Sequence, residues 1–392
     1  MRTGHGRQVD LDGLLDDVRT LVGCESPSHD RAAVARSAAE VARLGERHLG
    51  SEPERIVVDG RTHLRWRLGA GPTRVLLLAH HDTVWPVGSL ATHPCTVEDG
   101  VLRGPGCFDM KTGLVMALHA VAALDDLDGV TLLVTGDEEI GSPSSRALIE
   151  DEARGAEAAL VLEASADGGA LKTERKGVSL YEVGVTGRAA HAGLEPERGV
   201  NATLELAHHA LVVAGLGRPD LGTTVTPTAL HSGTTTNTVP AAGSFAVDVR
   251  ARTREEQTRV DRALTSLRPV LDGAAVTVTG GPNRPPLDAV SSAGLFERVT
   301  EVAARLGLPT PTSAAVGGAS DGNVTAGVGT PTLDGLGAVG GGAHADHEHV
   351  LVDEVPGRTA LLAGLVADLL ARPLAGLDGA TNHAPASGGA RP

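Results

Sequence analysis

Apolar residues recur along the first part of the chain in two alternating patterns. Helical spacing of Val, Leu and Ala predicts helices at 9–23, 30–48, 110–124 and 143–153. Short apolar runs between them predict strands at 55–59, 63–68, 74–79, 130–135 and 158–162. The run at 74–79 is apolar almost throughout, as expected of a strand that is covered on both faces. This alternation predicts a layered α/β sheet.

The pattern changes in the middle of the chain. Residues 178–186 alternate between polar and apolar side chains, which predicts a half-buried strand. The elements expected after it are a helix at 199–215, strands at 223–231 and 243–251, a charged helix at 253–270 and a strand at 274–279. The order β-α-β-β-α-β is that of a ferredoxin-like sandwich.

The pattern of the first part returns near the C-terminus. It predicts a helix at 289–306, a Gly-rich stretch at 317–322, a strand at 331–333 and a helix at 353–371. We therefore interpret 178–286 as an insertion into one α/β domain, which is formed by 1–177 together with 287–372. Residues 373–392 are Pro, Ala, Gly and polar residues without periodicity, so we expect a disordered tail.

Composition narrows the class of protein. The chain has 392 residues, of which 41% are apolar but only 2% aromatic, so its core must consist mainly of Leu, Val and Ala. The net charge of −15 argues against non-specific binding of nucleic acid, which needs an excess of Lys and Arg. Apolar runs such as 75–79 are too short to span a membrane. The polar N-terminus does not resemble a secretory signal, so we expect a cytoplasmic protein.

Side chains that can bind metal follow the apolar strands. His80 and Asp82 follow 74–79, Glu138 and Glu139 follow 130–135, and Glu163 follows 158–162. Open α/β sheets bind ligands at the carboxyl ends of their strands, so these side chains should lie close together. Positions i and i+2 face the same side of a strand, so one of the pair His80 and Asp82 can bind metal while the other orients it. The intervening His81 points away.

Other candidates lie in Gly-rich loops. Asp109 enters an apolar helix, where it can be a metal ligand or an ordinary N-cap. His344 lies beside Asp346, His347, Glu348 and His349, in what is either a solvated turn or a loop that supplies one ligand. Among the three cysteines, which have no CxxC spacing, Cys107 is near Asp109 but is expected to be a packed thiol.

Together these residues suit a pair of metal ions. Two imidazoles and three carboxylates can hold two zinc-like ions, with one further carboxylate left as a base. Because Glu138 and Glu139 are adjacent, their side chains diverge, and one can bind metal while the other reaches for water. Cobalt or manganese would fit the same ligands.

Taken in this order, the motifs resemble those of the M20 family of metallopeptidases. They are Ala79-His80-His81-Asp82-Thr83, Gly104 to Lys111, Asp137-Glu138-Glu139, Leu162-Glu163-Ala164 and Gly342-Ala343-His344-Ala345-Asp346. The match runs from about residue 9 to about residue 371. The resemblance implies a zinc-peptidase-like layered α/β catalytic domain with an inserted ferredoxin-like α+β lid, which also serves as the dimerisation domain. A homodimer formed through the lid is therefore expected.

The resemblance also implies a role for each matching residue. His80, Asp109, Glu139, Glu163 and His344 become the ligands of two Zn²⁺ ions, with Asp109 as the bridge. Glu138 becomes the general base, and Asp82 holds His80. In the lid, His191, Asn237 and Arg250 match motifs that contact substrate, with His191 reaching the partner's active site. Ala164 departs from the Pro common at this place, which puts in doubt how firmly the backbone of Glu163 is fixed.

Within the family, the chain looks most similar to the glutamate carboxypeptidase branch. Arg284 is a candidate clamp for a substrate carboxylate, and the turn containing Gly318 and Ser320 can present N–H groups to it or be merely structural. We expect a small peptide or N-acyl amino acid as substrate and release of a C-terminal amino acid, with glutamate as a candidate. The alternatives are an N-acyl-amino-acid deacylase or desuccinylase on the same scaffold, and a non-catalytic binding protein.

Overall fold

A six-stranded sheet forms the centre of the computed structural model, which describes residues 9–374. Its strands in spatial order are β1 (Glu54–Val58), β2 (Arg61–Leu68), β6 (Val130–Thr135), β3 (Val75–His80), β7 (Ala158–Val161) and β16 (Thr332–Leu333). The last four strands are parallel, whereas β1 and β2 are antiparallel to their neighbours. Every residue of β3 and β6 is buried, in agreement with their apolar sequences.

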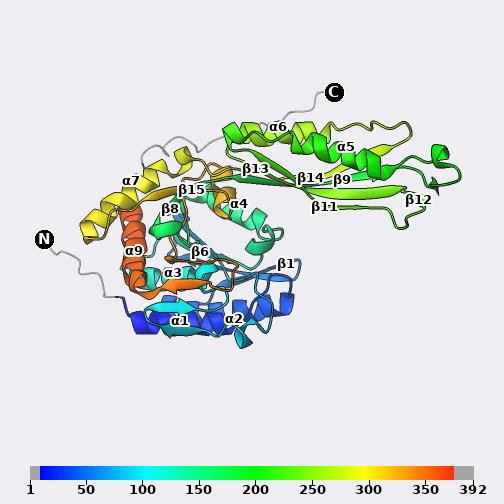
Figure 1. The fold of residues 1–392 in the computed structure, drawn as a ribbon. Coiled ribbons are helices and arrows are strands. Elements are labelled where there is room, and N and C mark those ends of the chain that lie inside the picture. The colour runs from blue at the N-terminus through cyan, green and yellow to red at the C-terminus, as the bar shows by residue number, and fades with distance from the viewer. Residues whose placement is uncertain (1–8, 375–392) are drawn as a thin grey trace, which may run out of the picture.

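Helices cover both faces of this sheet (Figure 1). One face packs against α1 (Leu11–Gly23), α2 (Arg31–Leu49), α3 (Thr112–Ala122) and α9 (Val355–Ala371). The other face packs against α4 (Arg146–Gly155) and the short helix α8 (Gly322–Gly327), while α7 (Ala289–Leu306) lies beside β16 and α9. Trp66 of β2 is buried under α2, where a side chain on Gly45 would lie 2.2 Å from the indole ring. Only glycine permits that close approach.

A second, four-stranded antiparallel sheet extends from this body as an arm, which we call the lid (Figure 1). Its elements in chain order are β9 (Gly177–Thr186), α5 (Ala202–Ala214), β11 (Thr224–Ser232), β13 (Ala242–Ala251), α6 (Arg254–Thr265) and β14 (Ala275–Arg284). The spatial order β11-β13-β9-β14 is that of the ferredoxin-like sandwich, so the fold prediction is confirmed. The lid has its own core, in which Tyr181, Val183 and Val185 of β9 pack with α5 and α6. The boundaries at 178 and 286 remain predictions.

Several short strands were not predicted. A parallel pair joins β8 (Leu171–Arg175) to β15 (Ser313–Val316). A small antiparallel sheet contains β4 (Thr96–Glu98), β5 (Val101–Arg103), β17 (Gly340–Gly341) and β18 (His349–Leu351). These strands have two to five residues, too few to show a clear period.

Several predicted segments have different limits in the structure. The predicted charged helix at 253–270, for example, ends at Thr265. The predicted helix at 143–153 begins only at Arg146, because the carboxylate of Asp137 accepts hydrogen bonds from Ser144 and Ser145 and holds them in a loop. The predicted strand at 274–279 continues to Arg284. The predicted disordered tail lies, beyond residue 374, outside the described residues. No helix within residues 9–374 is long and apolar enough to cross a membrane, and the cytoplasmic location stays a prediction.

Candidate metal centre

Five side chains from different elements converge at the carboxyl edge of the central sheet. His80 ends β3, Glu139 lies in the turn after β6, and Glu163 follows β7. Because β6, β3 and β7 are parallel neighbours, their carboxyl ends meet. Asp109 arrives from the turn Cys107–Lys111 before α3, and His344 from the loop after β17. The structure therefore brings together all five residues that the sequence predicts as ligands.

Asp109 stands between the two imidazoles. Its Oδ1 lies 3.3 Å from Nε2 of His80, and its Oδ2 lies 3.4 Å from Nε2 of His344. Glu163 Oε1 completes the first group at 3.6 Å from His80 Nε2. Glu139 Oε2 completes the second group at 3.0 Å from His344 Nε2. A carboxylate with one oxygen toward each group has the arrangement of a bridging ligand between two ions.

The hydrogen bonding of these atoms fits metal ligands. Nδ1 of His80 lies 3.0 Å from the carbonyl oxygen of Asp82, which can only accept, so Nδ1 carries the proton. When the ring is neutral, as metal binding requires, Nε2 offers its lone pair on the side of Asp109 and Glu163. Within residues 9–374, the buried atoms Nε2 of His80 and Oε1 of Glu139 have no hydrogen-bond partner. Imidazole nitrogen and carboxylate oxygen suit zinc, cobalt or manganese.

The pKa shifts within the cluster also fit a metal site. Burial raises the pKa of Glu139 to about 7. Burial opposes ionisation of Asp109 too, but the imidazoles of His344 and His80 outweigh it and hold the pKa of Asp109 well below its ordinary value. Asp109 and Glu139 in turn raise the pKa of His344 to about 10. Carboxylates outnumber imidazoles here, so a divalent cation would stabilise their ionised forms.

Asp82 is fully buried, and its carboxylate positions the turn of Glu138 and Glu139 as well as the ring of His80. Its Oδ1 lies 3.5 Å from His80 Nδ1 and accepts the backbone N–H of Glu138 at 3.2 Å. Its Oδ2 accepts the N–H of Glu139 at 3.2 Å and the hydroxyl of Ser28 at 2.6 Å. Burial tends to raise the pKa of Asp82, but these contacts with His80 and Ser28 lower it overall. One carboxylate thus fixes both the histidine ligand and the turn that carries the two glutamates.

The carboxylate of Glu348 holds the turn that carries Asp109. Its Oε1 accepts the N–H groups of Phe108 and Asp109 at 2.8 and 3.0 Å, and its Oε2 accepts that of Gly106 at 3.0 Å and the indole N–H of Trp85 at 2.6 Å. The sequence placed Glu348 in a polar cluster near His344 but did not indicate its contact with residues about 240 positions earlier.

Glu138 is the remaining acid, and it lies against Arg284. Nη2 of Arg284 donates to Glu138 Oε1 at 2.8 Å, to Ser142 Oγ at 2.8 Å and to Asp321 Oδ1 at 2.9 Å. Burial raises the pKa of Glu138 well above its ordinary value of 4.5, against the opposing charge of Arg284. Arg284 is itself only 7% exposed, so in this structure its guanidinium serves protein acceptors. That arrangement does not match the predicted clamp on a substrate carboxylate.

The turn with Gly318 and Ser320 is held by hydrogen bonds within the protein. Ser320 is fully buried, its N–H donates to Asn323 Oδ1, and its hydroxyl donates to Asp334. The carbonyl of Gly318 accepts from Arg175, which also pairs with Asp334 and lies 3.6 Å from Glu163. Since the N–H of Ser320 is engaged, the structural alternative fits this residue better than the ligand-binding one. Arg175 was not predicted as a site residue.

Of the three predicted lid residues, His191 and Asn237 lie away from the cluster, whereas Arg250 is level with Arg284 in the sheet of the lid. His191 in β10 (Ala190–His191) pairs with β12 (Thr238–Val239), and Asn237 accepts the N–H of Ala192 through its carbonyl at 2.9 Å. Figure 1 places β12 at the outer end of the lid, far from β6. Arg250 near the inner end of β13 pairs with Asp248 through two contacts of 2.8 Å.

His81 and Cys107, which the sequence analysis did not predict as metal ligands, lie outside the centre. His81 points away, with Nε2 against the carbonyl of Thr62 at 3.1 Å, and burial lowers its pKa to about 4. Cys107 is fully buried and burial raises its pKa well above the ordinary value, so it is a packed thiol.

Comparison with known proteins agrees with this geometry. The profile of peptidase family M20/M25/M40 matches residues 76–368, a range that holds all five metal-ligand candidates. The chain belongs to this family. It is therefore a hydrolase of the M20 metallopeptidase type.

Relatives within the M20 family differ in activity. Carboxypeptidase G2 from Pseudomonas sp. strain RS-16 is 31% identical over 91% of this chain and 89% of its own. Succinyl-diaminopimelate desuccinylase 2 from Shewanella loihica is 28% identical over 59% of this chain and 67% of its own. Both a peptidase and an amidohydrolase are thus among the similar sequences.

Solved structures of M20 proteins share the fold. Aminopeptidase PepT from Bacillus cereus superposes with a TM-score of 0.71 at 22% identity, covering 92% of this chain and 99% of that one. The M20 family metallo-carboxypeptidase Sso-CP2 from Sulfolobus solfataricus gives 0.67 at 17% identity, covering 91% and 98%.

Proposed function

We propose that this chain is a two-metal amide hydrolase that releases a C-terminal amino acid, with glutamate as the first candidate, from a small peptide or N-acyl amino acid. The observation that carries the proposal is Asp109, whose two oxygens face His80 and His344 at 3.3 and 3.4 Å. The sequence similarity to carboxypeptidase G2, which covers 91% of this chain, supports carboxypeptidase activity at this centre.

The proposed ligands are His80, Asp109, Glu139, Glu163 and His344. When bound, a pair of Zn²⁺ ions supplies Lewis-acid chemistry at the scissile carbonyl and lowers the pKa of water, and cobalt or manganese would serve the same role. Glu138 takes the proton of the attacking water at a carboxylate oxygen and then delivers it to the leaving amine. Asp82 keeps Glu138 and Glu139 in place through their backbone N–H groups.

His191 and Asn237 fit the proposed substrate side only in an assembly. His191 is exposed at the outer end of the lid, so we propose that it acts at the centre of a second copy, together with Asn237. Arg250, close to the body of its own subunit, is the proposed contact for the substrate carboxylate. The side chains of this pair are about one third exposed, so Arg250 can exchange Asp248 for a ligand.

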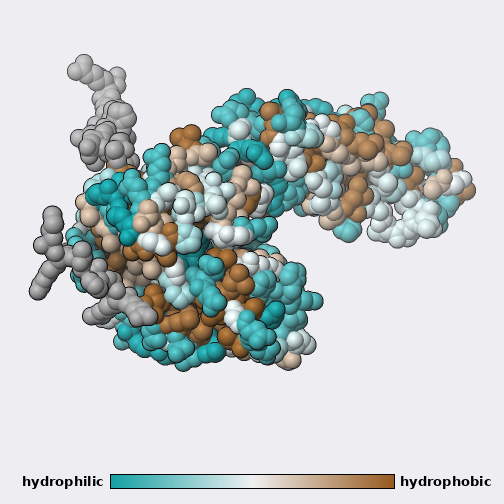
Figure 2. Space-filling model, turned by 60° about the vertical axis from the view of Figure 1, so that its left-hand side comes forward, coloured by the Kyte–Doolittle hydropathy of each residue, from teal (hydrophilic) through white to brown (hydrophobic). Residues whose placement is uncertain are grey.

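An apolar surface on the lid supports a homodimer. Leu204 and Leu211 of α5 are 60% and 78% exposed, and Leu230 of the edge strand β11 is 47% exposed. Figure 2 shows apolar residues gathered along the lid. An unpaired edge strand beside exposed leucines is a surface that a second copy can cover.

A second candidate is an N-acyl-amino-acid deacylase or desuccinylase. The matches to several succinyl-diaminopimelate desuccinylases favour it, including one that is 40% identical over 18% of this chain. The metal centre and Glu138 would do the same chemistry in either enzyme, so the acyl side of the substrate separates the two.

A substrate panel tests the proposal. Zinc-loaded protein is given N-acyl amino acids and dipeptides that vary the C-terminal residue and the acyl group, and released amino acid is measured. Preference for C-terminal glutamate, lost in Glu138→Ala and after chelation, is the expected result. Turnover restricted to acetyl or succinyl groups would support the deacylase instead. Absence of turnover across the panel, with two metals bound, would contradict both.

A further inference from the structure

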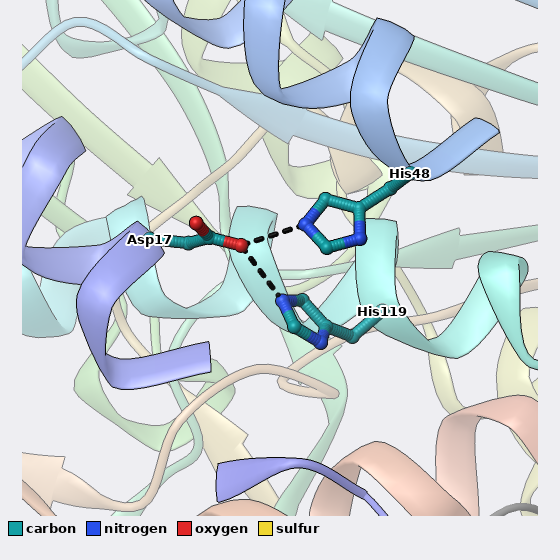
Figure 3. Close-up of side chains that lie close together, drawn as sticks. All are labelled: Asp17, His48 and His119. Carbon is teal, nitrogen blue, oxygen red and sulfur yellow. Dashed lines mark hydrogen bonds and ion pairs between the residues drawn. The ribbon is translucent and has the colours of Figure 1, made fainter. Parts of the chain in front are cut away.

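A second group of metal-ligand side chains lies among the helices, away from the sheet edge. Asp17 of α1, His48 of α2 and His119 of α3 point toward one another (Figure 3). His119 comes ten residues after Asp109, mostly along α3, which corresponds to about 15 Å of helix. The group therefore lies apart from the proposed catalytic centre.

The geometry of this group is close and largely buried. Oδ2 of Asp17 lies 2.6 Å from Nε2 of His48 and 2.9 Å from Nε2 of His119. The side chains are only 6%, 18% and 12% exposed, respectively. The two rings are 4.2 Å apart between centroids. All three ligand atoms lie within 4.8 Å of one another.

The other oxygen of Asp17 is already held. Arg47 donates from Nη2 to Oδ1, which leaves Oδ2 as the oxygen that faces both imidazoles. A carboxylate ligand whose second oxygen accepts a hydrogen bond is the usual arrangement around protein metals. Burial lowers the pKa of His119, although Asp17 opposes the shift, so this ring gives up its extra proton readily.

We propose that Asp17, His48 and His119 bind one divalent transition metal of the zinc type, as a structural site that joins α1, α2 and α3. Two imidazole nitrogens, one carboxylate oxygen and a water would give a tetrahedral set. Ligand atoms in such a set are about 3.3 Å apart, so small ring rotations would separate the present hydrogen-bonded atoms.

Binding at this site has a defined proton balance. Each Nε2 that now donates to Asp17 must lose its N–H proton before it can donate its lone pair to the ion. A neutral ring moves this proton to its own Nδ1 by tautomerisation, whereas an imidazolium must release one proton to solvent. The affinity for metal must therefore fall as the pH is lowered and the rings become protonated. Without metal, the same three side chains form hydrogen bonds between packed helices, which is the competing interpretation.

Zinc content in a variant with a disabled catalytic centre tests the site. In His80→Gln/Asp109→Asn, zinc per chain is measured after dialysis, with and without the added change His119→Gln. Gln keeps an N–H donor for Asp17 but is a poor zinc ligand. The expected result is one ion per chain, lost on adding His119→Gln and retained with His29→Gln, an exposed histidine.

A second measurement does not use His119→Gln, so it does not depend on the folding of that variant. Cu²⁺ added at one equivalent to the disabled protein should give an electron paramagnetic resonance spectrum with two nitrogen ligands, and Asp17→Asn should change it. Zinc should also raise the melting temperature of this protein but not that of Asp17→Asn. Zinc content near zero, or content unchanged by both substitutions, would overturn the proposal and leave a hydrogen-bonded cluster.

Discussion

Arg284, the last residue of β14, donates a hydrogen bond of 2.8 Å to the carboxylate of Glu138. The strand belongs to the lid, whereas Glu138 follows β6 of the central sheet. The ion pair therefore links the lid to the proposed general base. A lid movement that displaces β14 must either carry Glu138 with it or break this contact.

Substitution of Arg284 distinguishes positioning from substrate binding. Lys in this position keeps the charge, but its shorter side chain cannot place a nitrogen where Nη2 of Arg284 contacts Glu138, Ser142 and Asp321. Because misplacement of a catalytic group by about 1 Å can reduce rates about 100-fold, we expect Arg284→Lys to lower kcat about 10- to 100-fold with little change in KM. Steady-state kinetics measure both. A rise in KM at constant kcat would instead support the prediction that Arg284 binds a carboxylate of the substrate. Arg146→Lys, which also contacts the end of β14, is the control.

Asp82→Asn should weaken the metal centre. The amide offers one acceptor where the carboxylate offers two, and its NH₂ group would face an N–H of Glu138 or Glu139. We expect zinc affinity or activity to fall about 10- to 100-fold, which competition with a chelator and kcat would reveal. Asp99→Asn, in an exposed turn, should leave both unchanged. Equal behaviour of the two variants would refute the positioning role of Asp82.

Glu348→Gln should act on the centre through Asp109. The four N–H groups that converge on Glu348 need two acceptor oxygens, and glutamine supplies only one. The turn carrying Asp109 then loosens, and we expect metal affinity to fall about 10-fold or more. Glu98→Gln, an exposed acid nearby, provides the comparison. If the zinc affinities of both variants match that of the parent protein, Glu348 does not support the centre.

Glu256 gives a pH-dependent contribution to the stability of the lid. Hydrogen bonds from Arg259 lower its pKa from the ordinary value of 4.5 to about 2. Because the folded pKa is depressed, the stabilisation is present above about pH 4.5 and is lost as the pH falls toward 2. Urea unfolding should show Glu256→Gln less stable than the parent at pH 7, with the difference shrinking below pH 4.5. A difference that is constant between pH 7 and pH 3 would exclude this linkage.

The convergence of the metal-ligand candidates was predictable because it depends on few local rules. His80, Glu139 and Glu163 each follow an apolar strand, and parallel strands bring such positions to one edge. The assignment of Asp109 and His344 as ligands needed the family resemblance. Spacing alone is also explained by a helix N-cap at Asp109 and by a solvated turn at His344.

The partner of Arg284 was not predictable, because the end of β14 has no strand signal. Gly280, Gly281 and Pro282 interrupt the alternation, yet pairing with β9 continues to Arg284 after a register shift. Gly280 has a φ of 95°, and a side chain there would lie 2.1 Å from the carbonyl oxygen of Leu180. Only the folded sheet shows that the strand delivers Arg284 to Glu138.

The fluorescence of the two tryptophans, Trp66 and Trp85, should report on two different parts of the protein. Trp66 is 2% exposed in the core beneath α2, so its fluorescence follows global unfolding. Trp85 donates its indole N–H to Glu348, the residue that holds the turn of Asp109. Emission from Trp85 should therefore respond to changes at the metal centre that leave the core intact. Replacing either indole by Phe assigns the two signals, so local loosening and global denaturation can be followed separately in one unlabelled sample.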